Sequence, residues 1–454
     1  MMDLMLGHRA TPSPSRPASS RAALTARALL AGTLVPAALV LATLPPAALA
    51  DPAPGEATPP AFAYQAEGRE VEGGASLAQA ALVDPGNHRD SFAAGGAEQG
   101  DDGTVKYYRV AVADGQRVHA AATIAAPPYA DGLPEDNAQL TLDVSFLTAA
   151  GATCDDGWET DIGESQHGDG PITSTAVSDT MGPDGCAGDE LFVRVAREGP
   201  RDLDVPLPVE LQIAIQPAGI GGGAPAVEEP VEDDGARPIA PEDTEPLTPG
   251  RSFAAPTVVE PGSHVLELVP GETAVLALDV QEGQRLRWRT EVVSQPENQP
   301  GSLSLRVHNA ARSLVEVGGG SWPLGGSAGV RGGGMRAPVD LGNRSAQQTS
   351  IAEAWLPGRH TVVLQRLQRD TAADPEGDAP VRLILTLEVE GETAEGAADG
   401  SVLELGDAES TSAGFFGGSA AMVRGLQLAG AAVLALAALV LGAAGVLVLR
   451  PRRS

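Results

Sequence analysis

Apolar and polar residues alternate with a period of two in two stretches of the chain, and this pattern predicts strands. The first stretch contains such segments at 106–112, 117–124, 139–146, 190–195 and 209–215. The second contains them at 265–268, 274–280, 285–289, 302–307, 360–364 and 381–387. Alternation bounded by Gly, Pro and Asp indicates strands with one buried face. No window of comparable length has the period of an amphipathic helix, so the ectodomain is predicted to be all-β.

Two apolar runs without alternation predict membrane-related segments. Residues 426–449 carry no charge and no proline, and a bilayer core of roughly 30 Å needs about 20 helical residues. Arg450, Arg452 and Arg453 follow at once, and clustered positive charge favours the cytoplasmic side. Residues 28–50 follow a basic region and end in Ala-Leu-Ala, which is typical of a secretory signal peptide; the alternative is an uncleaved anchor.

These features predict a single-pass type I membrane protein at the cell surface, with an extracellular N-terminus and a cytoplasmic C-terminus. The predicted segments are a signal peptide (1–50), a disordered segment (51–75), a first β-sandwich (76–217), an acidic Pro/Gly linker (218–250), a second β-sandwich (251–391), a stalk (392–425), the transmembrane helix (426–449) and a cytoplasmic tail (450–454). The linker is acidic and rich in Gly and Pro, and is expected to be extended and self-repelling.

The two predicted domains share a sequence repeat, about 170 residues apart. The segment 83–88 (VDPGNH) matches 259–264 (VEPGSH), and 114–118 (DGQRV) matches 282–286 (EGQRL). The second pair predicts a tight turn between two strands. Its arginines, Arg117 and Arg285, are expected to point outward, either as hairpin edge residues or as ligand contacts. His88 and His264 recur at equivalent positions, where capping of a turn or packing is expected.

Residues 107–118 of the first copy resemble the bacterial pre-peptidase C-terminal modules, which have an aromatic-rich strand, a glycine turn and then an alternating strand. Tyr107, Tyr108 and Gly115 carry the resemblance; the second copy has 276–278 (LAL) in place of the tyrosines. The resemblance implies a jelly-roll-like β-sandwich that binds a ligand or separates other domains and has no catalytic activity. The whole layout also resembles single-pass surface proteins of actinobacteria. The use of arginine in place of lysine is typical of the same source.

The net charge of −30 changes the range of possible partners. Binding of nucleic acid needs a basic surface, so no nucleic-acid partner is expected. An acidic exterior favours solubility and repels anionic lipid.

The cysteines, Cys154 and Cys186, predict a disulfide, because both lie in one predicted extracellular domain; free or metal-ligating thiols are the alternative. The loop that they close would be worth about 3–4 kcal/mol by the chain-entropy estimate. The segment between and beside them is expected to be a strandless, acidic loop, with Asp155, Asp156, Glu159, Asp161, Glu164, Asp169, Asp184 and Asp189. Carboxylates could bind Ca²⁺, but the loop has no EF-hand spacing, so no metal site is assigned.

No catalytic or cofactor-binding constellation is recognised. Residues 325–329 match G-x-S-x-G, but a nucleophile elbow needs a strand before it and a helix after it. The surrounding glycine-rich segment 318–334 is expected to be a flexible loop. The leading hypothesis is a non-enzymatic cell-envelope protein that binds or scaffolds an extracellular protein or wall polymer at the membrane. The alternatives are an envelope hydrolase or its accessory subunit, and a Ca²⁺-dependent adhesin.

Overall fold

The structure is a computed structural model. Of the 454 residues it describes 62–93, 104–128, 140–157, 160–165, 170–183, 185–199, 205–297, 301–325, 329–367, 379–397 and 401–406. All of them lie in one compact unit, Ala53–Ser454. The predicted signal peptide, transmembrane helix and cytoplasmic tail lie outside the described residues. Within the described ranges, no helix has the length and apolar character needed to cross a membrane.

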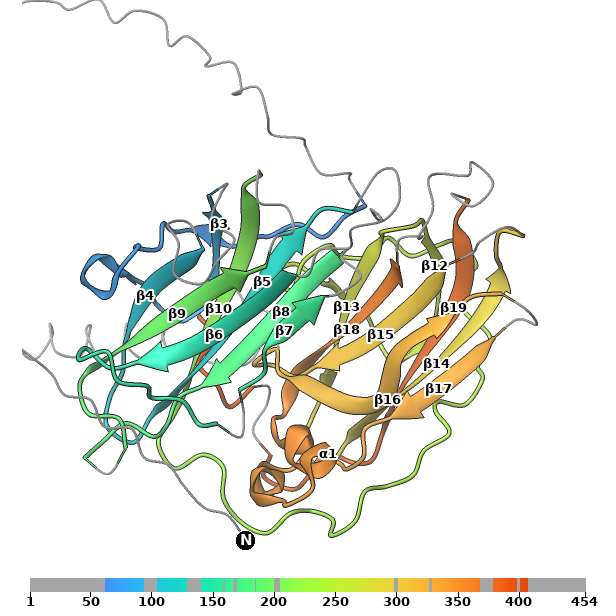
Figure 1. Cartoon of the computed structure of the whole chain (residues 1–454). Helices are drawn as coiled ribbons and strands as arrows, with labels where there is room; N and C mark the ends of the chain where they lie inside the picture. Colours follow the sequence, from blue (N-terminus) through green and yellow to red (C-terminus); the bar gives the residue numbers. More distant parts are fainter. Residues whose placement is uncertain are drawn as a thin grey trace, which may run out of the picture. The chain divides into compact units, whose positions relative to one another are not determined.

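The first sandwich (blue to green in Figure 1) consists of two sheets, with strand orders β1-β3-β10-β5-β8 and β2-β4-β9-β6-β7. The short strands β1 and β2 pair in parallel with β3 and β4, and the other pairings are antiparallel. The bounds are β1 Arg69–Glu70, β2 Ala81–Leu82, β3 Gly86–Phe92, β4 Val105–Ala111, β5 Arg117–Ala126, β6 Leu140–Leu147, β7 Gly163–Ser165, β8 Gly170–Val177, β9 Glu190–Glu198 and β10 Leu207–Gln216.

The second sandwich (yellow to orange in Figure 1) has sheets of order β12-β19-β14-β17 and β11-β13-β18-β15-β16. The bounds are β11 Thr257–Val258, β12 Gly262–Leu268, β13 Thr273–Val280, β14 Arg285–Ser294, β15 Ser302–His308, β16 Leu314–Pro323, β17 Val330–Gly334, β18 Gly358–Leu367 and β19 Val381–Glu390.

The repeat predicted from sequence corresponds to a repeat of topology. The order β3-β10-β5-β8 becomes β12-β19-β14-β17, and β2-β4-β9-β6-β7 becomes β11-β13-β18-β15-β16. The register agrees as well, since Gly86 at the start of β3 pairs with Ile213, and Gly262 at the start of β12 pairs with Leu387. In both copies the long strands alternate between the two sheets as they do in a jelly roll.

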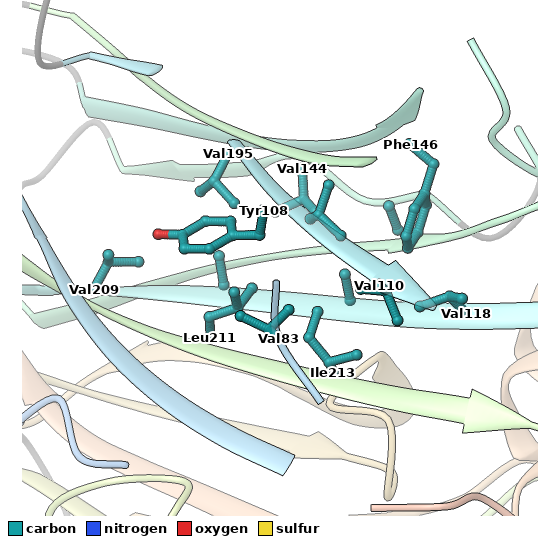
Figure 2. Packing of buried hydrophobic residues seen from close by; sticks show 14 of the residues in the cluster. Val83, Tyr108, Val110, Val118, Val144, Phe146, Val195, Val209, Leu211 and Ile213 are labelled. Carbon is teal, nitrogen blue, oxygen red and sulfur yellow. The ribbon is translucent and has the colours of Figure 1, made fainter. Parts of the chain in front are cut away.

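The core of the first sandwich lies between its two sheets, as Figure 2 shows. Strand β6 illustrates the cause, because its side chains are alternately buried and half-buried along its whole length, as the two-residue period of a strand requires. Tyr108 of β4, Val144 of β6 and Leu211 of β10 meet in this layer (Figure 2) and are each at most 1% exposed. The second sandwich is built in the same way around Trp288 and Trp322, whose rings stack with centroids 5.9 Å apart.

The predicted strands are all present, but several others escaped the alternation pattern. Strands β7 and β8 lie between the two cysteines, so the expectation of a strandless loop was wrong. Strands β16 and β17 occupy the glycine-rich stretch that was expected to be a flexible loop. Small residues explain the misses: β8 is GPITSTAV and β17 is VRGGG, and glycine is a poor strand signal. At Gly333 a Cβ atom would lie 2.1 Å from the Val317 oxygen, so close strand packing requires glycine there.

Helical structure in the described residues is limited to four short pieces, in agreement with the all-β prediction. The longest run joins a 3₁₀ turn, a one-turn helix α1 and a second 3₁₀ turn between β17 and β18. The bounds are Leu77–Gln79, Leu341–Ser345, α1 Thr349–Ala352 and Glu353–Trp355.

The segment 218–250 contains no strand, but it packs against the second sandwich and is not the extended, self-repelling chain that was expected. Asp233 lies between two arginines of β14: its carboxylate is 2.8 Å from Arg285 Nη1 and 2.9 Å from Arg287 Nε. Arg237 binds Glu388 of β19 at 2.7 Å. Ion pairs with basic side chains of the sandwich therefore offset the repulsion among the acids of this segment.

Candidate functional site

The outer faces of two sheets, one from each sandwich, are buried against each other. Strands β5 and β10 are buried on both faces over nearly their whole length. Ala125 of β5 belongs to a buried cluster with Val275 of β13 and Val363 of β18. Ala214 of β10 belongs to another cluster with Trp355 and Leu356. The sandwiches therefore share an apolar interface, and a strand with two buried faces no longer shows strict alternation.

A buried ion pair crosses this interface. Glu210 of β10 and Arg312, in the turn after β15, are 2.7 Å apart, and their side chains are 0% and 3% exposed. The Tyr64 hydroxyl and the Glu67 amide donate to Glu210 Oε2, both at 3.1 Å. Arg312 Nη2 also donates to Asn87 Oδ1 at 2.7 Å. Burial raises the pKa of the Glu210 carboxyl, although the Arg312 charge acts in the opposite direction.

Residues near the disulfide form a second polar contact between the sandwiches. Asp156 accepts from Arg117 Nη1 of the first sandwich at 2.6 Å and lies 3.6 Å from Arg344 Nη2 of the second. The Arg344 guanidinium lies 5.1 Å from the Trp355 ring centroid, which stacks on His119 of β5 at 5.9 Å. Burial lowers the pKa of His119 to about 4, so this ring is neutral at pH 7 and packs as a structural group.

Segments that were predicted to be unstructured also hold the two sandwiches together. Tyr64, in the segment predicted to be disordered, is 2% exposed, and its hydroxyl accepts from the Phe253 amide at 3.1 Å. Glu404, in the predicted stalk, exchanges two backbone hydrogen bonds with Ile215 at the end of β10, at 2.8 and 3.1 Å. Residues 62–75 are therefore ordered, against the expectation of disorder, and residues 401–406 of the predicted stalk pack against the first sandwich.

A small pocket, partly open to solvent, lies beside this interface. One wall is an edge strand of the first sandwich, and the other is the outer face of β15 and β18 together with the start of the second domain. The lining residues are Pro171, Thr173, Phe253, Ser304, Arg306, His308, Val363 and Gln365.

The imidazole of His308 helps to define the chemistry of this pocket. His308 Nδ1 is 2.8 Å from the Arg312 carbonyl oxygen, and a carbonyl can only accept, so Nδ1 carries the proton. Burial lowers the pKa of His308 to about 4, and the nearby charges of Arg306 and Arg312 act in the same direction. At pH 7 the ring is therefore neutral and adds no charge to the pocket.

The predicted disulfide is confirmed: Cys154 and Cys186 are bonded, with Cα atoms 5.8 Å apart. Both cysteines are buried in the core of the first sandwich. The bond therefore ties the start of the segment that carries β7 and β8 to its end.

The described acids of that segment make separate contacts. Asp155 accepts from the Phe146 amide, and burial, with smaller contributions from the charges of Asp143 and Asp179, raises its pKa to about 6. Asp161 pairs through its backbone with Thr175, and the Asp189 carbonyl accepts from Val112. Glu159, Asp169 and Asp184 lie outside the described residues. Among the residues that are described, no group of three or more His, Cys, Asp or Glu is placed to hold a metal ion.

The two repeat arginines pair with acids and are largely covered, with side chains 21% and 15% exposed. Arg117 binds Asp156, and Arg285 binds Asp233 and Glu390. The repeat histidines cap their turns in the same way: His88 Nε2 contacts the Asp84 oxygen at 2.8 Å, and His264 Nε2 contacts the Glu260 oxygen at 3.0 Å. Residues 326–328 of the G-x-S-x-G match lie outside the described ranges.

Sequence reasoning missed Tyr64, Glu210, Arg306 and Arg312. Glu210 and Arg306 stand at polar positions of alternating strands, which predicts that they face outward. Within its own sandwich, each of these two side chains does lie on the outer face of its sheet. The sequence contains no signal that a second sandwich would then cover the face that carries Glu210.

No known protein family and no curated protein matches this chain, and the resemblance to pre-peptidase C-terminal modules gains no support from them. Among solved structures, the chain is similar to the tandem CBM22-1-CBM22-2 domain of Paenibacillus barcinonensis Xyn10C, with 10% identity, 63% of this chain and 82% of that chain covered, and a TM-score of 0.15. It is also similar to the ANX1 ectodomain of Arabidopsis thaliana, with 8% identity, 66% and 88% covered, and a TM-score of 0.17. TM-scores this low support no argument about fold or function.

Proposed function

We propose that this chain is a non-enzymatic surface protein that binds an extracellular partner, a protein or a wall polymer, and holds it at the cell membrane. The observation that carries the proposal is the locked pair of sandwiches with a pocket between them. A ligand that bridges two flexibly linked domains would have to order them on binding, which costs affinity. Here the buried Glu210–Arg312 pair and the apolar clusters fix the pocket before any ligand arrives.

The titratable side chains at the interface support a binding role over a catalytic one. His119 and His308 are buried, with pKa values lowered to about 4, whereas a general base at neutral pH works best with a pKa near the operating pH. Asp156 is engaged with arginine. These groups are arranged to hold two domains together.

The proposed location rests on the sequence: a signal peptide at 1–50 and a transmembrane helix at 426–449 would place the sandwiches outside and residues 450–454 inside. The net charge of −30 would repel the two sandwiches from a surface of anionic lipid.

In-cell crosslinking of the tagged full-length protein, followed by mass spectrometry, tests the proposal. A defined secreted or membrane protein, or a wall glycan, should be recovered with the wild type and lost with Arg312→Met, which loosens the domain pair. Arg89→Gln is the matched control, because Arg89 takes part in an exposed ion pair with Glu70. Recovery of no specific partner, or of hydrolysed wall fragments that the purified protein itself produces, would refute a non-enzymatic binding role.

A further inference from the structure

Arg306 of β15 stands out on a face that is otherwise covered. Its neighbours on the same face, Ser304 and His308, are 7% and 6% exposed, whereas Arg306 is exposed. The pairing of β15 with β16 shifts register between Leu305 and Val307, so no β16 residue lies directly opposite Arg306. On its other side Arg306 pairs with Val363 of β18, and both residues line the pocket.

The described residues offer this guanidinium no partner. Within the described part of the chain, Arg306 makes no hydrogen bond or ion pair. In contrast, Arg285, Arg287, Arg289 and Arg382 of the same sandwich each bind a carboxylate.

We propose that this pocket binds the terminal carboxylate of an otherwise uncharged peptide, with Arg306 as the anchor. A planar guanidinium matches a carboxylate with two parallel hydrogen bonds. Ser304 and Thr173 line the same pocket, and Val363 and Pro171 offer an apolar wall to the adjoining residue. This inference rests on the proposed binding function and names the ligand class for the same pocket.

Two observations favour a peptide terminus over an acidic polymer or a sugar. The net charge of −30 repels a polyanion but only weakly opposes one carboxylate at an arginine. A sugar ring usually packs on an open aromatic face, but Phe253, the aromatic ring of this pocket, is 4% exposed. Arg312 lies over the Phe253 ring at 5.0 Å, and His308 packs against it with ring centroids also 5.0 Å apart.

The test is calorimetric titration of the purified full-length protein with acetyl-Ala-Ala as the free acid and, separately, as the C-terminal amide. The free acid should bind and the amide should bind at least tenfold more weakly, because a hydrogen-bonded charge is lost. Arg306→Gln should weaken the acid about tenfold or more and leave the amide unchanged. Arg331→Gln is the matched control, since Arg331 is also exposed and does not line the pocket.

Equal affinity for acid and amide, no effect of Arg306→Gln, no binding at millimolar peptide, or tighter binding of an oligouronate would each overturn the inference. The two proposals can fail separately. Crosslinking that recovers the same partner from wild type and Arg306→Gln would leave the binding function standing and refute the role of Arg306. Peptide binding without any partner in cells would support the pocket chemistry and refute the envelope function.

Discussion

Removing one member of the Glu210–Arg312 pair should uncouple the two sandwiches. The side chains are 0% and 3% exposed and 2.7 Å apart, and loss of one partner of a buried pair costs about 3–5 kcal/mol because the other charge stays buried. Glu210→Gln keeps one oxygen that can accept from both Tyr64 and Glu67, but it places an amide donor opposite Arg312, so it removes both the charge and the hydrogen bond of the pair. Arg312 has a φ of 62°, and Arg312→Met adds no new backbone strain because both residues carry a Cβ.

Each single variant should lower the free energy of unfolding by about 3 kcal/mol, and the double variant by much less than the sum, with a coupling of about 2–3 kcal/mol. Urea unfolding, followed by tryptophan fluorescence, measures this. Trp355 lies in the interface and Trp288 in the core of the second sandwich, so the single variants should also change one transition into two.

The exposed pair of Arg89 and Glu70, with side chains 45% and 82% exposed, provides the control, and Glu70→Gln should cost less than about 1 kcal/mol. If the two interface variants cost no more than this control, or if their effects simply add, the pair does not hold the domains together and the reasoning fails.

Three further outcomes are expected. Asp233→Asn should release the segment 218–250, because Asp233 is 1% exposed between two arginines; limited proteolysis should cut there faster, and an unchanged rate would contradict the packing role of this carboxylate. Cys154→Ala with Cys186→Ala should cost about 3–4 kcal/mol of unfolding free energy, measured against the wild type with and without reductant; a loss below about 1 kcal/mol would show that β7 and β8 hold the segment unaided. Burial, followed by the charges of Asp161 and Glu316, raises the pKa of Glu353 from 4.5 to about 7. The stability that Glu353 contributes is therefore present below pH 4.5 and lost as the pH rises through about 7, so Glu353→Gln should raise Tm at pH 8 and flatten its fall across this window, and an unchanged pH profile would refute this assignment.

The sequence by itself determined the class of fold and its duplication. Period-two alternation located the central strands, because one buried face leaves a local pattern. The repeats around Gly86 and Gly262 predicted two equivalent domains. In the structure each glycine has a positive φ, 131° and 156°, and begins the equivalent strand of its sandwich. The presence of both cysteines in one predicted domain was enough to predict the disulfide between them.

The tertiary structure decided what covers each sheet. The interface rests on residues such as Glu210 and Tyr64, whose sequence neighbours give no indication of a partner more than 100 positions away. The segment 218–250 was misjudged for the same reason: its acids repel one another in isolation, but Asp233 meets arginines supplied by β14. The place of Arg306 in a pocket that Thr173 of the first sandwich also lines likewise depends on how the two sandwiches pack. Ion pairs and burial between distant segments depend on three-dimensional proximity, which a local sequence pattern does not encode.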